Sequence, residues 1–201
     1  MSELLSFARL GVRHILDLEA MDHVLFLVAL AAIYRFRDLR AVLWVVTAFT
    51  LGHSLTLALA VTDALELPSA LVEFLIPVTI VLTGIENVMV SERARAPWDG
   101  RYRPVFAGVF GLVHGAGFAT YLKALFVQRI AVPLLGFNLG IEAGQLVVLA
   151  AVAICLGVVD ACIGSSRLAR GRWPVVRVRA VAVSLVVIVV ATQWAAERTP
   201  W

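Results

Sequence analysis

Six long runs of apolar residues, separated by short segments that contain arginine or proline, constrain the fold of this chain most strongly. A helix that crosses a lipid bilayer needs about 20 mostly apolar residues. With 61% hydrophobic and 15% charged residues, a chain of 201 residues cannot bury its apolar surface in one soluble core. The pattern predicts an all-α membrane protein, a single bundle of about six transmembrane helices. The expected helices are residues 16–34, 41–62, 71–90, 104–126, 133–163 and 175–195, within one domain that comprises residues 1–201.

Arginine is concentrated in every second segment between the apolar runs. Basic loops of membrane proteins stay on the cytoplasmic side, and residues 63–70 contain no basic residue. We therefore predict that the first, third and fifth loops face the cytoplasm and that both termini face outward. The same arginines account for the net charge of +3 without a nucleic-acid partner, for which the sequence carries no motif. They are Arg35, Arg37 and Arg40, then Arg93, Arg95, Arg101 and Arg103, and finally Arg167, Arg170 and Arg172.

Ionisable and amide side chains occur inside these apolar runs. Each costs at least a few kcal/mol in hydrocarbon unless it is paired, hydrated or functional. Counted at about 1.5 Å per residue from the outer face, four of the predicted helices place a histidine or carboxylate at a similar depth, roughly 12–18 Å below the surface. Scattered polar residues would have no reason to align in this way. The intramembrane set is His14, Asp22, His23, His53, Glu73, Glu86, Asn87, His114, Asn138, Glu142 and Gln145.

The residue types at this shared depth point to a metal. Imidazole and carboxylate groups together bind zinc, nickel, cobalt, iron or copper rather than calcium or magnesium. The sequence therefore predicts one desolvated site for a divalent transition metal ion. Its expected ligands are His23, His53, His114, Asp22 and Glu142.

Helical spacing adds two patterns around this site. Asn138, Glu142 and Gln145 follow each other at i, i+4 and i+7, which predicts one polar stripe on a helix. Gly108, Gly111 and Gly115 form a small-residue face that lets a neighbouring helix approach closely. That face would serve packing within the bundle or a homo-oligomer equally well.

Each polar side chain also has a purely structural interpretation. His53 and His114 would then form interhelical hydrogen bonds. Glu73 would be a solvated residue at the outer mouth. Glu86 and Asn87 would pair with the arginines of the following loop.

Five segments that contain these residues resemble the HupE/UreJ family of membrane proteins. Their order along residues 14–146 makes the resemblance specific, and the last helix contributes little to it. The first segment departs from the family pattern, which usually has a glycine shortly before the Asp-His pair and a shorter gap after the leading histidine. The segments are HILDLEAMDHVLFLVAL (14–30), TAFTLGHSLTLALA (47–60), VEFLIPVTIVLTGIEN (72–87), FGLVHGAGFA (110–119) and GFNLGIEAGQL (136–146).

The resemblance implies a multi-pass protein of the bacterial inner membrane that is linked to nickel. Such a protein would act as a metal permease or as an accessory of hydrogenase or urease maturation, with a maturation protein as its partner. By position, the resemblance assigns metal contact to His14, Asp22, His23, His53, His114 and Glu142.

The leading hypothesis is a transporter for a divalent transition metal ion, with Ni²⁺ or Co²⁺ favoured over Zn²⁺. The ion would enter past Glu73, pause at the histidine and carboxylate site, and leave inward past Glu86 and Asn87. Mixed ligands of this kind can release their ion. The sequence has no nucleotide-binding motif, so gradients or a partner would supply the energy.

Two alternatives remain open at this point. Three histidines and a water form a catalytic zinc site, so the chain would fit an intramembrane zinc-dependent hydrolase, with Ser54 and Asp22 assisting. A metal-binding accessory protein would instead hold the ion without transporting it. Haem binding by two of the histidines has no supporting pocket signal. The leading hypothesis assigns no catalytic residue.

Overall fold

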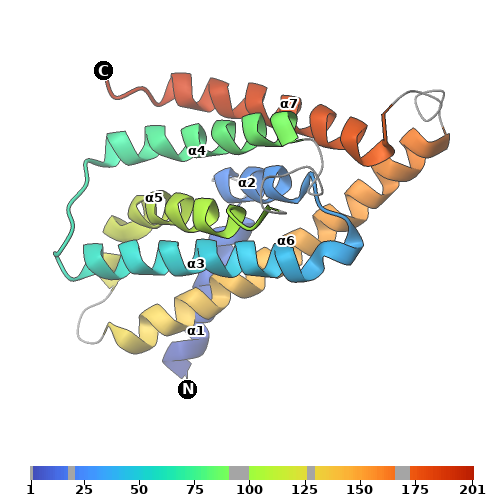
Figure 1. Ribbon diagram of the computed structural model, residues 1–201. Helices are drawn as coiled ribbons and strands as arrows, with labels where there is room; N and C mark the ends of the chain where they lie inside the picture. The colour runs from blue at the N-terminus through green and yellow to red at the C-terminus, as the bar shows by residue number, and fades with distance from the viewer. Residues whose placement is uncertain (1, 18–20, 91–99, 126–129, 166–172) are drawn as a thin grey trace.

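The computed structural model describes residues 2–17, 21–90, 100–125, 130–165 and 173–201 (Figure 1). This part of the chain is all-helical and contains no strand, which confirms the predicted fold class. Arg93, Arg95, Arg167, Arg170 and Arg172 lie outside the described residues. The helices are α1 (Ser2–Leu16), α2 (Asp22–Ala31), the short 3-10 helix η1 (Phe36–Asp38), α3 (Leu39–Val61), α4 (Ser69–Val90), α5 (Arg103–Leu125), α6 (Ala131–Ser165) and α7 (Val175–Glu197).

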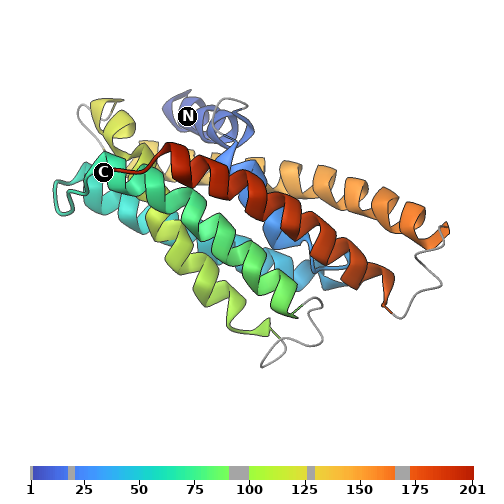
Figure 2. The same ribbon diagram turned by 90° about the horizontal axis from the view of Figure 1, so that it is seen from above.

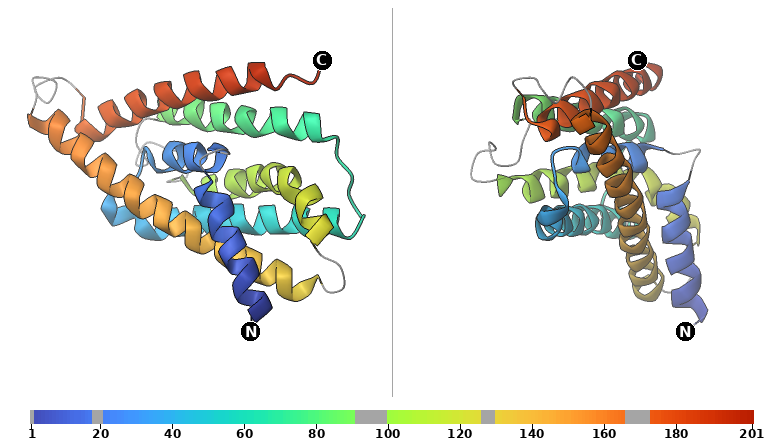
Figure 3. Two further views of the ribbon diagram at one scale, coloured as in Figure 1. Left: turned by 180° about the vertical axis from the view of Figure 1, so that it is seen from behind. Right: turned by 90° about the vertical axis from the view of Figure 1, so that its right-hand side faces the viewer.

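Four segments of the described chain are long and apolar enough to cross a membrane. They are η1 with α3, then α4, α6 and α7. The chain is therefore a helical membrane protein. Helix α6 has 35 residues and is about 50 Å long, well above the roughly 30 Å of a hydrocarbon core. It accordingly runs obliquely across the other helices (Figures 1 and 3).

The first predicted span, residues 16–34, is wrong: one helix ends where that span was to begin, and a second, short helix lies within it, too short to cross a bilayer alone. Helix α1 ends at Leu16, and α2 begins at Asp22 and has only 10 residues. The charged residues Asp17 and Glu19 separate the two apolar segments in the sequence. A continuous helix through them would carry both carboxylates into hydrocarbon, which is costly. The helix stops before this stretch instead, and Asp17 is exposed.

The helices associate in three close pairs around α2. Helices α3 and α5 run parallel, α4 and α7 run antiparallel, and α1 packs along the first half of α6 (Figures 1 and 2). The short α2 contacts α4, α6 and α7. Figure 3 shows it enclosed among the longer helices. A residue in the first turn of α2 therefore lies deep inside the bundle.

Glycines bring the backbones of two helix pairs, α3 with α5 and α1 with α6, into direct contact. A Cβ atom at Gly52 would lie 2.0 Å from the Gly108 carbonyl oxygen, and one at Gly111 would lie 2.1 Å from that of Phe49. Between α1 and α6, a Cβ atom at Gly140 would lie 2.0 Å from the Ala8 carbonyl oxygen. The glycine face predicted on residues 104–126 thus packs against α3 inside the bundle.

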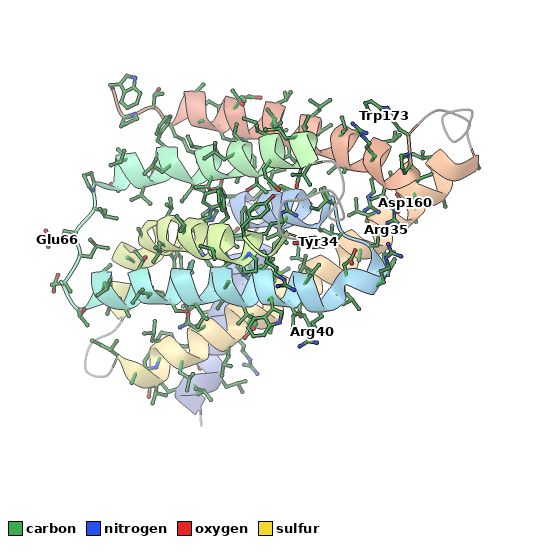
Figure 4. All side chains as sticks on the ribbon, viewed as in Figure 1. Tyr34, Arg35, Arg40, Glu66, Asp160 and Trp173 are labelled. Carbon is green, nitrogen blue, oxygen red and sulfur yellow. The ribbon has the colours of Figure 1, made fainter. Side chains whose placement is uncertain are left out.

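The described loop arginines gather at one end of the bundle. Figure 4 shows Arg35 and Arg40 at the end opposite Glu66, which lies in the connection between α3 and α4. Arg101 and Arg103 lie at the start of α5, at the same end as the start of α3 (Figure 1). This separation is what the cytoplasmic placement of basic loops requires. The orientation of the bundle in the membrane stays a prediction.

Candidate metal centre

Four helices bring all four histidines together in the bundle interior. His14 lies in the last turn of α1, His23 in the first turn of α2, His53 within α3 and His114 within α5. The ring centroids of His14 and His23 are 4.6 Å apart, and those of His23 and His114 are 5.3 Å apart. The His53 ring lies 6.0 Å from that of His14. The side chains that the sequence placed at one depth form one cluster of imidazoles.

Three of these side chains are close enough to share an ion. One nitrogen from each of His14, His23 and His53 lies within 4.8 Å of the others. Nitrogens that bind one ion at about 2.1 Å in tetrahedral geometry lie roughly 3.4 Å apart. Each imidazole comes from a different helix and turns about its own torsions, so small ring rotations close the gap. The His114 ring lies beside this group, next to His23.

The imidazoles of this cluster are largely unpartnered. Buried polar atoms in proteins nearly always have a hydrogen-bond partner, and an unsatisfied one costs about 1–3 kcal/mol. Six buried ring nitrogens here have none within the described part of the chain. They are Nε2 of His14, both nitrogens of His23 and of His53, and Nδ1 of His114. Their concentration at one point indicates a site for a ligand that binds imidazole, and a transition metal ion is the ligand that such a donor set favours.

Phenylalanine rings enclose the histidines. The Phe118 and Phe137 rings are stacked with their centroids 5.3 Å apart, and the centroids of the Phe118 and His14 rings are 4.0 Å apart. The centroids of the Phe49 and His114 rings are 5.1 Å apart. An apolar shell of this kind restricts water and lowers the dielectric around a metal site.

The sequence carries a signal for this aromatic shell that was not among the predictions above. A phenylalanine stands three or four residues from each of three histidines, and residues at that spacing are neighbours on a helix surface. The pairs are Phe26 with His23, Phe49 with His53, and Phe118 with His114. Apolar residues are so common in this chain that the spacing alone did not single them out.

A threonine on α4 orients the His114 ring. Thr79 Oγ1 donates its hydrogen bond to the Ile76 carbonyl oxygen at 2.7 Å. The same oxygen lies 3.0 Å from His114 Nε2. Because the hydroxyl hydrogen is already used, Thr79 accepts a hydrogen bond from the Nε2–H group. This contact assigns the proton to Nε2 and leaves the Nδ1 lone pair free for a metal.

Replacing Thr79 by valine is expected to weaken metal binding by roughly 10-fold or more, as for other partners of metal-binding histidines. The substitution removes the acceptor that fixes the His114 tautomer. Isothermal titration with Ni²⁺ and Co²⁺ would measure the change. Thr83→Val is the matched control, because among the described residues Thr83 Oγ1 donates only to the Thr79 carbonyl oxygen, one turn away. Equal affinities in the two variants would contradict the role assigned to Thr79.

The two carboxylates predicted as ligands are engaged elsewhere. Both oxygens of Asp22 accept hydrogen bonds from Arg198 Nη1, at 3.1 and 3.0 Å. Asp22 also lies in the first turn of α2, where a negative charge stabilises the helix dipole. Glu142 accepts a hydrogen bond from the Thr47 hydroxyl at 3.0 Å. The structure thus brings the imidazoles together without these two acids.

The polar stripe on α6 connects that helix to α3. Gln145 Oε1 accepts a hydrogen bond from Thr50 at 2.8 Å, one turn beyond the contact between Glu142 and Thr47. Ser54 donates to the Thr50 carbonyl oxygen at 2.6 Å. Asn138 Oδ1 is buried without a partner among the residues described here.

The predicted inward exit is filled by an arginine. Arg103 Nη2 donates to Glu86 Oε2 at 2.6 Å and to Asn87 Oδ1 at 2.5 Å. Asn87 in turn donates to the Ala29 carbonyl oxygen at 2.6 Å. Tyr102 donates to the other Glu86 oxygen; burial and this carboxylate raise the pKa of the phenol, so it stays protonated. Glu86 and Asn87 thus pair with an arginine of the following loop, as their purely structural interpretation predicted.

Comparison with protein families matches residues 1–198 of this chain to the HupE/UreJ protein family. No curated protein and no solved structure gives a match. The match extends the resemblance noted for residues 14–146 to nearly the whole chain, including α1 and α7. The chain therefore belongs to the HupE/UreJ family.

Proposed function

We propose that this protein carries a divalent transition metal ion, Ni²⁺ or Co²⁺ by preference, across the inner membrane through the four-histidine cluster. The proposal rests on one observation: six buried ring nitrogens have no hydrogen-bond partner among the residues that the structure describes. Imidazole ligands without thiolate suit a cargo that must leave again. The ion is the transported substrate rather than a resident cofactor.

The interrupted helix supports transport over storage. Transporters commonly build their substrate sites from broken helices that end at mid-membrane depth. Helix α1 ends two residues after His14, and α2 begins one residue before His23. The end of α1 and the start of α2 therefore lie directly beside two members of the cluster. Two half-helices can shift relative to each other more readily than one continuous helix.

Two arginine–carboxylate pairs stand on either side of the cluster in this proposal. Asp22 and Arg198 lie on the side of the chain's C-terminus, and Glu86 and Arg103 on the side of the loop arginines. Glu73 is exposed near the start of α4, where an incoming ion would meet it. Opening one pair at a time would give the site access to one side of the membrane at a time. We propose protons as the counter-ion: a histidine that takes up a proton after the ion has left must release it again before the next ion binds.

The hydrolase hypothesis receives less support from the same contacts. It needs Ser54 and Asp22 to assist a metal-bound water. The Ser54 hydroxyl donates to the Thr50 carbonyl oxygen, and Asp22 pairs with Arg198. Neither group is directed at the histidines in this arrangement.

Metal analysis of the purified protein is the first test. We expect the wild type to bind Ni²⁺ or Co²⁺, and His53→Ala to bind it more than about 100-fold more weakly, since loss of even an outer partner costs 10–100-fold. Gln193→Ala is the control, because Gln193 bonds the exposed Glu197 at 2.9 Å on α7. Equal metal content in wild type and His53→Ala would refute the site.

Uptake into proteoliposomes is the second test, with nickel, cobalt and zinc supplied separately outside and a pH indicator inside. Metal uptake by the wild type, lost in His53→Ala, would support transport, and a matching pH change would support proton exchange. Metal binding without uptake would favour the accessory role. Hydrolysis of bilayer lipid that depends on zinc and His53 would favour the enzyme.

A further inference from the structure

A groove of about 870 Å³ lies where the second half of α6 leans away from α3 and α7. Its walls are apolar, with Leu39 and Leu43 on one side and Leu149 and Ile154 on the other. Figure 3 shows the oblique course of α6 that separates these helices. A space of this kind inside a bilayer is filled by lipid or by protein, because hydrocarbon surrounds it.

Arginines line the groove together with these apolar walls. Arg35, Arg37 and Arg179 face a single acid there, Asp160. Arg179 is already used, because it donates to Asp160 Oδ2 at 2.5 Å and to the Tyr34 carbonyl oxygen at 2.6 Å. Arg35 and Arg37 line the groove beside this pair, and the Arg35 backbone N–H donates to Asp38 Oδ2 at 3.0 Å at its edge. Arg35 is also repelled by the charge of Arg179. Three arginines against one acid give the lining of the groove an excess of positive charge.

We propose that this groove binds an anionic phospholipid, with the phosphate held by Arg35 and Arg37 and the acyl chains lying between α3 and α6. Guanidinium groups bind phosphate through paired hydrogen bonds. The groove volume falls within the range of about 300–1,000 Å³ that is usual for ligand sites. Basic pockets between transmembrane helices on the cytoplasmic side recognise anionic headgroups in this way.

Charge distinguishes this occupant from the others. The acyl chains of all bilayer lipids are equally apolar, so selectivity must come from the headgroup. A zwitterionic lipid would leave the excess positive charge of the lining uncompensated. A second copy of the chain, paired about a two-fold axis, would bring the same arginines face to face. The anionic phospholipid satisfies the apolar walls and the positive charge together.

Native mass spectrometry of the full chain in neutral detergent would test this proposal, with phosphatidylglycerol and phosphatidylcholine of identical acyl chains as probes. We expect the wild type to retain phosphatidylglycerol roughly 10- to 30-fold better, the effect of two arginines near an anionic phosphate. Arg35→Gln/Arg37→Gln should abolish this preference. Arg40→Gln/Arg101→Gln is the matched control, because these arginines line the neighbouring pocket, which Arg37 also borders, and neither of them lines the groove.

A second variant tests the acyl-chain part of the groove. Ala153 lines the groove on α6, and Ala153→Trp should fill it and reduce phosphatidylglycerol retention by about 10-fold with all arginines intact. The unfolding midpoint of each variant would verify that it is folded. Three results would each overturn the proposal: equal retention of the two lipids by the wild type, an equal loss in the Arg40/Arg101 control, or unchanged retention in Ala153→Trp.

Discussion

Replacing Gly140 by alanine is expected to separate α1 from α6, to lower the stability of the bundle by about 3 kcal/mol, and to remove the metal site. The new Cβ atom would lie 2.0 Å from the Ala8 carbonyl oxygen and 2.9 Å from the Ala8 Cα atom. Both are backbone atoms, so no side-chain rotation relieves the clash. Overpacking of a tight interface costs about 1–3 kcal/mol even where neighbours can adjust.

The metal site is lost with the packing because α1 carries His14. A shift of α1 that accommodates one methyl group moves His14 away from His23 and His53. We expect a lower unfolding midpoint in detergent together with weaker Ni²⁺ binding. The two readouts should change in parallel.

Gly164→Ala is the matched control on the same helix. Apart from its own helix backbone and chain neighbours, a Cβ atom at Gly164 meets no atom of the described residues within 4 Å, so alanine fits there without a clash. This variant should be as stable as the wild type or slightly more stable, with unchanged metal affinity. Equal behaviour of Gly140→Ala and Gly164→Ala would show that α1 does not pack on α6 as described.

The sequence predicted the helical bundle and the histidine cluster because both depend on features that are local in the chain. Apolar run lengths define spanning helices, and depth follows from counting residues along them. His23, His53 and His114 could therefore be placed at one level without knowledge of the packing. Their meeting point required only that the helices form one bundle.

The break between α1 and α2 could not be predicted by the same counting. Hydropathy averages over a window, and the apolar residues after His23 outweigh Asp17 and Glu19. The average hid the cost of two charges in one short stretch. Helix α1 escaped notice for a related reason, since its apolar face is a stripe of Leu4, Ala8, Gly11 and Ile15 rather than a continuous run.

The hydrogen-bond partners of Asp22 and Glu142 are far away in the sequence. Asp22 and Arg198 are 176 positions apart, and Glu142 and Thr47 are 95 apart. Depth alone placed both acids at the metal, but a carboxylate binds whichever donor or cation the fold brings nearest. The sequence offered arginine, threonine and a metal as partners, and only the packing selected among them.

Arg103→Gln is expected to destabilise the bundle by about 3 kcal/mol, because it leaves a largely enclosed carboxylate without its cation. Arg103 is 6% exposed and Glu86 is 21% exposed, so water can replace little of the lost interaction. The Arg103 guanidinium also lies 5.3 Å from the centre of the Tyr34 ring. Arg101→Gln, an exposed neighbour in the sequence, should be within about 0.5 kcal/mol of the wild type.

The double variant Arg103→Gln/Glu86→Gln separates charge from shape. It removes both charges and keeps side chains that hydrogen-bond, so it should recover most of the stability that the single variant loses. Thermal unfolding of the wild type, Arg103→Gln, Glu86→Gln and the double variant in one detergent would measure this double-mutant cycle. A double variant as unstable as Arg103→Gln would mean that the arginine acts through its packing, not through Glu86.

The same double variant tests whether this pair closes the inner exit. In the transport proposal, the guanidinium occupies the place between Glu86 and Asn87 through which the metal must leave. With both charges gone, proteoliposomes loaded with Ni²⁺ should release it faster than those with wild-type protein. If this pair closes the exit, its removal must change the rate of Ni²⁺ release. Release at the wild-type rate would therefore place the exit elsewhere and leave the Arg103–Glu86 pair with a purely structural role.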